Sequence, residues 1–375
     1  MTDIQMAKTA AKLLLNFNSA ENTVKLEPSG GGVAVQVRGD SKATVHLRGV
    51  GLRSTHFMPT TEFYETISSA PDSGVLSIRD LEGGGVAFSC ADWESKAATI
   101  CGDKKVKFWG KHFAPVFDTD EGSFTMRTVD FMDAVQAVSY AACELWNPLL
   151  NAVRFEAKND KVTVSASDGH RLASKVLPAH SCNSAEPMHI PANELRKLMP
   201  LLEYANKDVF SINSISPTDE IQLGKDSEGV IALRCDVLSI CFKDRESDSE
   251  DSYPIFSFAD LSEISRIKVY PQNLMRQLGS FLPVGGYAED KQRVLFWFSG
   301  GGDILTVETA GVILPFYCKS VREAFKEFQK YDDDVMLTFS KLLGKRRSTY
   351  VMQVTYPKDT SYIALIGALN TERMG

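Results

Sequence analysis

The residues whose types and spacing come closest to an acid–base arrangement are Asp168 and His170, followed directly by Arg171. A carboxylate beside an imidazole could orient the ring for general acid or base catalysis. The sequence adds no nucleophile or second carboxylate at a recognisable spacing, however. Two other interpretations of His170 therefore stay open: a histidine hydrogen-bonded at the end of a strand, or one side of a binding pocket.

The histidines and cysteines form no pattern typical of a metal site. The six histidines show no HExxH or similar spacing, and the seven cysteines never form a CxxC pair. The sequence therefore predicts no metal, no disulfide framework and no cofactor, and the scattered thiols favour a reducing cytoplasm. Three glycine runs lie between strand-like segments and open no helix, which indicates hairpin turns rather than phosphate-binding loops. These runs are Gly30–Gly32, Gly83–Gly85 and Gly300–Gly302.

Composition and charge limit the class of protein. The 375 residues, 43% hydrophobic and 24% charged, are typical of a soluble chain of two or three domains. No apolar run approaches the roughly 18 residues of a membrane span, and the first residues do not resemble a signal peptide. The 41 basic and 48 acidic residues give a net charge of −7, which argues against general electrostatic coating by nucleic acid. Any DNA role must therefore depend on a local basic surface or on topology.

An internal repeat is the most informative feature of the chain. The segment from Asn22 to Val35 matches the segment from Asn151 to Val164 without a gap, and Val294–Val307 is a third copy if two residues are inserted. Each copy alternates apolar and polar residues around a turn rich in glycine or asparagine, which predicts a β-hairpin. The residues matched at an offset of 129 are Val24 and Val153, Glu27 and Glu156, Val33 and Val162, and Val35 and Val164.

Amphipathic helices flank each hairpin and must position it. Apolar residues spaced by three and four predict one helix before each hairpin and one after it. The proline in Met58–Phe63 and in Ile190–Leu195 suits the first turn of the following helix. We therefore predict an α+β fold of three repeated domains, at 1–122, 123–259 and 260–375. The apolar faces are Ala7, Ala10, Ala11, Leu14; Phe131, Val135, Val138, Ala142; Leu274, Leu278, Phe281; and Val321, Phe325, Phe328.

One stretch resembles a known family. The segment Leu149–Ala173 ends in Ser-Asp-Gly-His-Arg-Leu-Ala, from Ser167 to Ala173, and closely resembles the middle domain of the bacterial DNA sliding clamp, the β subunit of DNA polymerase III. Further landmarks follow in the expected order: Ile190–Leu195, Tyr253-Pro254 and the closing strand Tyr362–Leu369. The resemblance covers essentially the whole chain and is strongest between about 124 and 205.

The resemblance implies a non-enzymatic ring. In this family two subunits join head to tail around duplex DNA, with two helices of each domain lining the hole and antiparallel sheets outside. Such a homodimer acts as a processivity factor for the replicative DNA polymerase and is opened by an ATP-dependent clamp loader. Repeats that leave a sheet edge open at each end can close a ring in this way.

The resemblance also implies a partner-peptide pocket, of the apolar kind with a few polar groups. The sequence departs from the family at Leu365-Ile366-Gly367, where Met-Pro-Met is usual, and at Phe258, where many members have arginine. The positions that match the family pocket are Leu150, Ser167, Gly169, His170, Arg171, Leu172, Pro254, Ile363, Ala364, Leu365, Ile366 and Gly367.

Basic residues on the expected helices would face DNA through nonspecific phosphate contacts. The helix from Val129 to Cys143 is an exception, since it carries Asp130 and Asp133 and no cation. Its acidity keeps an alternative open, a clamp-fold scaffold that no longer encircles DNA. An enzyme using Asp168 and His170 is the other alternative. The expected DNA-facing residues are Lys8, Lys12, Arg196, Lys197, Arg276, Arg322, Lys326 and Lys330.

Overall fold

The computed structural model divides into two compact units, each described here by itself. The first unit comprises Met1–Met132, Ala157–Asp160 and Pro178–Ser247, and the second comprises Asp133–Glu156, Lys161–Leu177 and Asp248–Gly375. The residues described are 3–17, 23–38, 42–48, 51–82, 84–101, 123–142, 149–182, 186–209, 220–226, 229–235, 238–244, 261–277, 284–287, 293–299, 304–309, 312–342 and 349–368.

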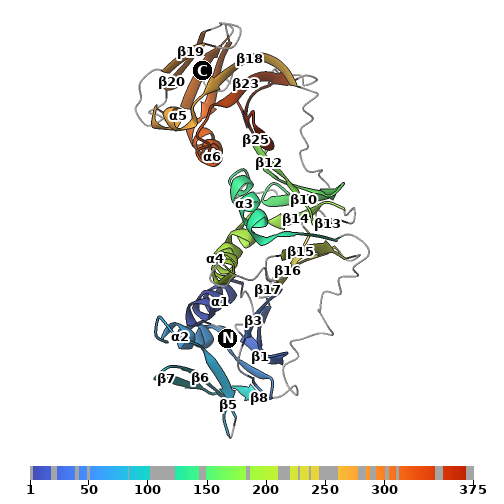
Figure 1. The fold of residues 1–375 in the computed structure, drawn as a ribbon, viewed down its shortest axis with the longest axis vertical. Coiled ribbons are helices and arrows are strands. Elements are labelled where there is room, and N and C mark those ends of the chain that lie inside the picture. The colour runs from blue at the N-terminus through green and yellow to red at the C-terminus, as the bar shows by residue number, and fades with distance from the viewer. Residues whose placement is uncertain are drawn as a thin grey trace. The chain divides into compact units, whose positions relative to one another are not determined.

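The first unit is built on a long antiparallel sheet (Figure 1). Its strands lie in the order β13 (Ser181–Cys182), β9 (Ser123–Arg127), β15 (Glu220–Lys225), β16 (Val230–Cys235), β17 (Leu238–Lys243), β3 (Lys42–Arg48), β2 (Gly32–Arg38), β1 (Thr23–Ser29), β4 (His56–Pro59) and β8 (Ile100–Cys101). A smaller sheet contains β5 (Ser77–Asp80), β6 (Val86–Cys90) and β7 (Trp93–Ala97). The unit also contains β14 (Met188–Pro191) and helices α1 (Ile4–Phe17), α2 (Thr60–Ser68) and α4 (Ala192–Val209).

The second unit also consists of a larger antiparallel sheet, a smaller sheet and helices. Its larger sheet runs in the order β10 (Ala152–Lys158), β11 (Lys161–Ser167), β12 (Arg171–Pro178), β25 (Asp359–Gly367), β24 (Thr349–Tyr356), β23 (Val335–Leu342) and β18 (Leu261–Val269). Its smaller sheet contains β19 (Val284–Tyr287), β20 (Arg293–Ser299), β21 (Ile304–Thr309) and β22 (Val312–Tyr317). The remaining helices of this unit are α5 (Pro271–Gln277), α6 (Cys318–Phe328) and the part of α3 (Thr128–Ser139) from Asp133 onward.

The predicted hairpins form where the turn residues allow them. In the first, Ser29 pairs with Gly32 across a two-residue turn, and Gly31 has a φ of +94° that side chains rarely adopt. In the second, Asn159 and Asp160 take φ values of 53° and 56°, which suit the tight turn between β10 and β11. Local turn chemistry therefore explains why the same sequence pattern gives the same hairpin.

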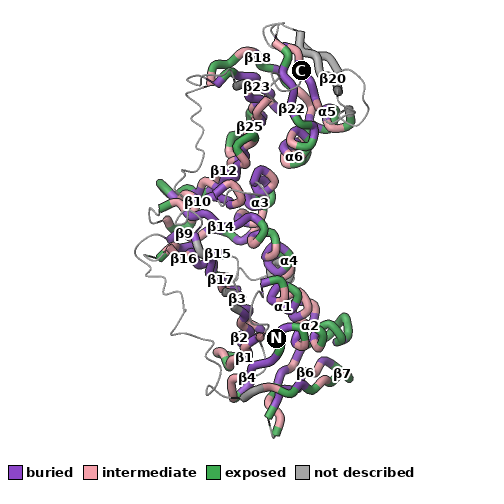
Figure 2. The backbone as a smooth tube through the Cα atoms, turned by 180° about the vertical axis from the view of Figure 1, so that it is seen from behind, coloured by how far each residue is buried: buried purple, intermediate pink, exposed green. Residues whose placement is uncertain are grey.

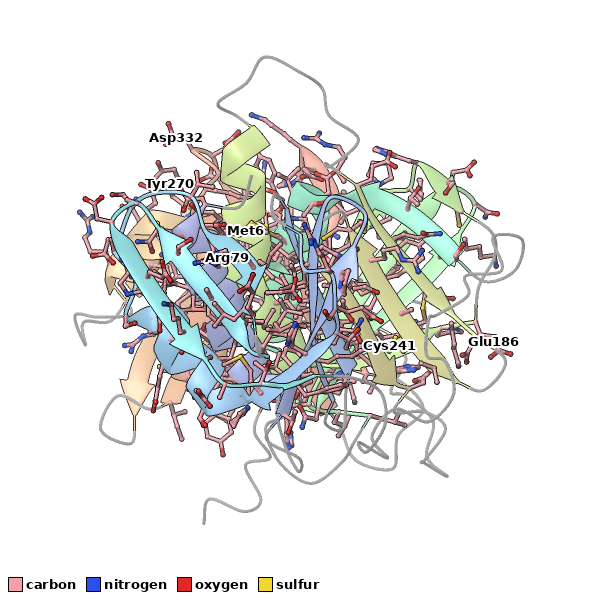
Figure 3. All side chains as sticks on the ribbon, turned by 90° about the horizontal axis from the view of Figure 1, so that it is seen from below. Met6, Arg79, Glu186, Cys241, Tyr270 and Asp332 are labelled. Carbon is pink, nitrogen blue, oxygen red and sulfur yellow. The ribbon has the colours of Figure 1, made fainter. Side chains whose placement is uncertain are left out.

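The apolar helix faces predicted from the sequence are buried (Figure 2). Ala7, Ala10, Ala11 and Leu14 are at most 1% exposed in α1, and Val321, Phe325 and Phe328 are fully buried in α6. On the solvent side, by contrast, Arg79 of the smaller first-unit sheet pairs with Glu94 at 3.2 Å. Figure 3 labels Arg79 beside the strands of this sheet. Leu278 and Phe281 lie outside the described residues.

Three details of the predicted helices need correction. Pro59 ends β4 as the N-cap residue of α2, and Pro191 ends β14, so neither proline lies within a first helical turn. The helix predicted to reach Cys143 ends at Ser139. Lys330 follows the end of α6 at Phe328. Such shifts of a residue or two are usual at helix ends, because capping depends on local backbone geometry.

The mixed helix and antiparallel-sheet class is confirmed, with six helices in the described part of the chain. The order helix, strands, helix, strands also recurs three times. The boundaries at 122 and 259 stay a prediction. Within the described ranges, no helix is long and apolar enough to span a bilayer.

Candidate functional site

The turn between β11 and β12 contains the residues that first suggested chemistry. Buried Ser167 donates its Oγ hydrogen to the Arg171 carbonyl at 2.9 Å and accepts the Gly169 amide at 3.1 Å. Gly169 has a φ of +85°, which permits the sharp reversal. His170 lies exposed at the tip of this turn.

Asp168 holds the turn together. Its Oδ1 accepts the amides of His170 and Arg171, each at 2.9 Å, and its Oδ2 accepts the Arg171 Nε hydrogen at 2.9 Å. Both carboxylate oxygens are therefore engaged by the turn itself. This arrangement suits a rigid loop that presents His170 better than it suits a carboxylate that orients the imidazole ring for catalysis.

Strand β12 continues from this turn and pairs with β25. Leu172 lies opposite Leu365, and Ser174 lies opposite Ile363. Cross-strand partners share one face of a sheet, so the two leucines form one apolar pair. They are 7% and 2% exposed. The pairing thus brings two parts of the predicted pocket together across almost 200 positions of sequence.

Gly367 fits closely against the turn. Its amide donates to the His170 carbonyl at 2.6 Å. A Cβ at Gly367 would lie only 2.8 Å from that same oxygen. The close contact leaves no room for a side chain at Gly367 unless one of the two backbones shifts.

The other face of the pair of strands packs against helices. Ala364 and Ile366 are at most 1% exposed, and Tyr362 donates to the Ala137 carbonyl at 3.2 Å. The guanidinium carbon of Arg171 lies 5.6 Å from the ring centroid of Tyr140, a cation–π contact. Burial raises the pKa of the Tyr140 and Tyr362 hydroxyls, so both stay neutral hydrogen-bonding groups.

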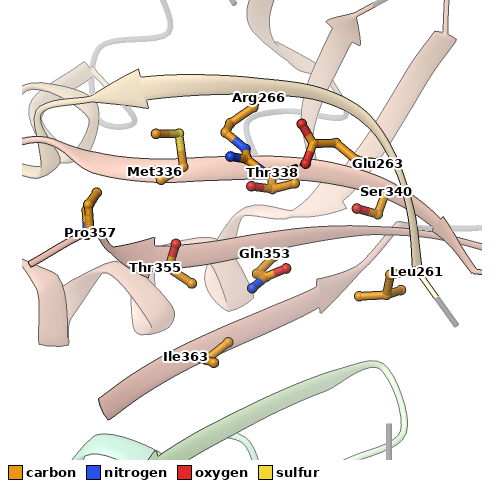
Figure 4. A pocket seen from close by; sticks show the side chains of 10 residues that line it. All are labelled: Leu261, Glu263, Arg266, Met336, Thr338, Ser340, Gln353, Thr355, Pro357 and Ile363. Atoms are coloured by element: carbon orange, nitrogen blue, oxygen red, sulfur yellow. Dashed lines mark hydrogen bonds and ion pairs between the residues drawn. The ribbon is translucent and has the colours of Figure 1, made fainter. Parts of the chain in front are cut away.

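A groove of about 510 Å³ opens on the face of the sheet that carries Leu172 and Leu365. Figure 4 shows the side chains that line this groove, with Ile363 of β25 among them. The groove lies on this face, because its residue Gln353 pairs with Leu365 and its residue Thr355 pairs with Ile363. The groove combines apolar side chains with hydroxyl and amide groups and with the ion pair of Arg266 and Glu263, and apolar walls with a few polar groups are typical of a ligand-binding cleft. The groove is lined by Leu261, Glu263, Arg266, Met336, Thr338, Ser340, Gln353, Thr355, Pro357 and Ile363.

Two predicted pocket residues are not part of this arrangement as described. Leu150 is half-buried in the turn before β10. Pro254 and Phe258 lie outside the described residues. The structure therefore brings Ser167, Gly169, His170, Arg171 and Leu172 together with Ile363 to Gly367, and the pocket as a whole stays a prediction.

Seven of the eight predicted DNA-facing residues lie on four helices, and Lys330 follows the end of α6. Lys8 and exposed Lys12 are on α1, Arg196 and Lys197 on α4, Arg276 on α5, and Arg322 and Lys326 on α6. Several of the cations are already paired with carboxylates or amides. The pairs are Lys8 with Asp72 at 2.8 Å, Lys197 with Glu194 at 2.9 Å, Lys326 with Glu323 at 2.9 Å, Arg276 with Asn273 at 3.2 Å, and Lys330 with Glu327.

Sequence reasoning missed the groove residues of β23 and β24 and the buried Lys175 of β12. Alternation could have shown that Met336, Thr338 and Ser340 share one face of a strand. It could not show that this face would adjoin Leu365, because strand pairing across distant segments leaves no local signal.

Comparison with known proteins gives a consistent picture. Residues 125–225 match the family model for the central domain of the DNA polymerase III beta subunit. No curated protein matches the sequence.

Solved structures agree over nearly the whole length. A DNA polymerase III beta subunit from Thermotoga maritima has a TM-score of 0.69 at 13% identity, covering 98% of each chain. The beta sliding clamp of Caulobacter crescentus gives 0.69 at 12% identity, and the beta chain from Streptococcus pneumoniae gives 0.67 at 14%, both again over 98% of each chain. The predicted resemblance is thereby confirmed: this chain has the fold of the DNA polymerase III beta sliding clamps throughout, and its central region resembles them in sequence as well.

Proposed function

We propose that this protein is a DNA sliding clamp, a non-enzymatic processivity factor that encircles duplex DNA and tethers a replicative DNA polymerase. The observation that carries the proposal is the fold shared over 98% of the chain with DNA polymerase III beta subunits. The partners would be double-stranded DNA, the polymerase, an ATP-dependent clamp loader and a second copy of the chain. All would act in the cytoplasm.

An open strand edge supports closure by a second copy. Along the chain, β3 follows the hairpin of β1 and β2 and pairs with β17 on its other edge, and β12 follows the hairpin of β10 and β11 and pairs with β25. Strand β22 likewise follows the hairpin of β20 and β21, and it pairs with β21. Among the described strands, none pairs with its outer edge. Its Ile313 and Tyr317 are 57% and 51% exposed, as expected for an edge that a partner covers.

In this ring, topological enclosure of the DNA, rather than strong DNA binding, would keep the protein on the duplex. The six helices carry nine basic and nine acidic residues, so their net charge is zero. A surface without net positive charge releases few counterions from DNA and binds it weakly. A closed ring needs little more, because it cannot leave DNA sideways.

The same charge balance favours one other candidate function. A clamp-fold scaffold that binds partner peptides without encircling DNA would also need no basic helices. The two functions differ in whether the protein stays on closed circular DNA, and that difference can be measured.

A loading experiment tests the proposal. Clamp and its loader would be incubated with nicked circular DNA, separated from free protein and then treated with a restriction enzyme. We expect the clamp to stay on circles, to leave after linearisation and to bind short duplexes weakly at all salt concentrations. Retention that does not depend on circularity would contradict the ring.

Ring closure has its own test. Changing Ile313→Asp and Tyr317→Asp together should convert a dimer to a monomer, because the two charges would be buried at the closing edge. Pro178→Asp is the control, since Pro178 is exposed at the end of β12 in the predicted middle domain. Analytical ultracentrifugation that finds the wild type monomeric at micromolar concentration would count against the ring and favour the scaffold.

A further inference from the structure

A buried lysine joins three elements of the second unit. Lys175 lies on β12, three positions beyond Leu172, and is 4% exposed. Its Nζ donates to the Asp133 carboxylate of α3 and, at 3.2 Å, to Glu327 Oε1 of α6. Burial alone would lower the pKa of Lys175, but the Asp133 hydrogen bond and the two negative charges raise it. The ammonium therefore stays charged and holds both helices to the strand.

A chain of contacts leads from Lys175 to the rim of the candidate pocket. Tyr362 lies opposite Lys175 in the strand register, and its hydroxyl is 3.4 Å from that of Tyr140. The Tyr140 ring in turn lies under the Arg171 guanidinium. Arg171 is bonded to Asp168, which holds the turn that presents His170. A shift of α3 against β12 would therefore move the rim.

The same two carboxylates also meet a cation at the surface. Lys330 pairs with Glu327, and its Nζ lies 3.8 Å from Asp133 Oδ1. The Lys330 side chain is 43% exposed, whereas that of Lys175 is 5% exposed. One buried and one exposed ammonium thus share Asp133 and Glu327. An anion that binds Lys330 therefore changes the electrostatic environment of Asp133, Glu327 and Lys175.

We propose that Lys175 is a positioning residue that couples charge at the helix surface to the geometry of the pocket rim at Arg171. The carboxylates of Asp133 and Glu327, which contact both the buried Lys175 and the exposed Lys330, supply the physical link that such coupling needs. The consequence for partner binding rests on the function proposed above, whereas the position of Arg171 does not.

Surface variants give the cleanest test, because they leave the buried cluster intact. Lys330→Gln is compared with Lys326→Gln, which removes an equivalent pair on the same segment but one that involves Glu323 instead. We expect Lys330→Gln to shift the NMR signal of the Arg171 Nε–H group. It should also change the affinity of a labelled peptide with leucine and phenylalanine anchors by roughly twofold to thirtyfold. Lys326→Gln should change neither.

Buried variants separate positioning from folding. Lys175→Met should displace the Arg171 signal, and Lys175→Arg, which keeps the charge, should restore most of it. Asp133→Asn should resemble Lys175→Met, while Asp130→Asn on the same helix should resemble the wild type. Wild-type Arg171 signals in Lys330→Gln and Asp133→Asn would overturn the inference. If the wild-type protein binds no peptide, the pocket assignment fails, but the Arg171 signal still decides this inference.

Discussion

Two strand junctions of the molecule have the same backbone arrangement and different side chains. In the first unit, β17 joins β3 through the pairs Leu238–Val45 and Ile240–Ala43, all fully buried and apolar. In the second unit, β25 joins β12 through pairs that include Leu172–Leu365 and Lys175–Tyr362. On the face that these two pairs share, the first junction is closed by apolar packing. The second adds a buried cation and a turn that presents His170.

The difference assigns the proposed peptide-binding function to the side chains of the second junction rather than to its backbone pairing. Backbone pairing is identical in kind at the two junctions, so it supplies only a continuous sheet. The side chains determine whether the junction is a purely structural strand pairing or one that adjoins a groove. A buried charge such as Lys175 costs free energy unless its partners are in place. A purely structural strand pairing can be stabilised by apolar side chains without such a charge.

Truncating one leucine at each junction should separate the two roles. Leu238→Ala and Leu365→Ala remove similar buried side chains, 0% and 2% exposed, and each should lower the free energy of unfolding by about 2–5 kcal/mol. Only Leu365→Ala should also weaken peptide binding. The expected loss of affinity is about tenfold or more, as for the truncation of an anchor residue at an interface. Urea unfolding and a peptide titration on both variants provide the measurement. Equal peptide affinity in Leu238→Ala and Leu365→Ala would contradict the proposal that only the second junction takes part in peptide binding.

The glycine that fits against the turn sharpens the comparison further. Gly367→Ala should cost about 1–3 kcal/mol, because the new Cβ meets the His170 carbonyl and one of the two backbones must move. Gly169→Ala is the control: its φ is unfavourable, but the space is open, so only local strain of about 1–2 kcal/mol is expected. A crystal structure of Gly367→Ala should show β25 displaced from the turn. An unchanged position would contradict the close fit.

The two units should also respond to opposite extremes of pH. Burial would raise the pKa of Asp80 in the first unit, but hydrogen bonds from His56, the Arg53 amide and Ser54 lower it from 3.8 to about 2. The stability that this carboxylate contributes is present above pH 3.8 and is lost as the pH falls toward 2. Lys175 has a raised pKa, so its contribution is complete below 10.5 and lost as the pH rises beyond that.

Unfolding measured across pH can check both signs. Asp80→Asn should remove the acid-dependent part, and Lys175→Met the alkaline part. As a control, each variant is also measured in the pH range of the other group. Asp80→Asn should leave the alkaline dependence of stability as it is in the wild type. Identical pH profiles for the wild type and Asp80→Asn between pH 2 and 5 would show that the hydrogen bonds of Asp80 contribute no net stability.

Much of the fold could be predicted because its signals are local. Period-two alternation around Asn159 and Asp160 predicts a hairpin, and the spacing of Val321, Phe325 and Phe328 predicts a buried helix face; both are confirmed. Leu172 could be placed in a candidate pocket only through the family motif. Its burial against Leu365 then follows from strand pairing. Helix ends were predicted less well, because capping depends on backbone geometry that composition does not encode.

By itself, the sequence determined the repeated elements, their apolar faces and the turn that contains Asp168 to Arg171, since each depends on residues near one another in the chain. Only the tertiary structure decided that Leu365 faces Leu172, that Gly367 lies close against the His170 carbonyl, and that Lys175 meets Asp133 and Glu327. These relations join residues as far apart as 152 positions or more. No local pattern records them, because they arise when separate strands and helices pack and bury their charges together.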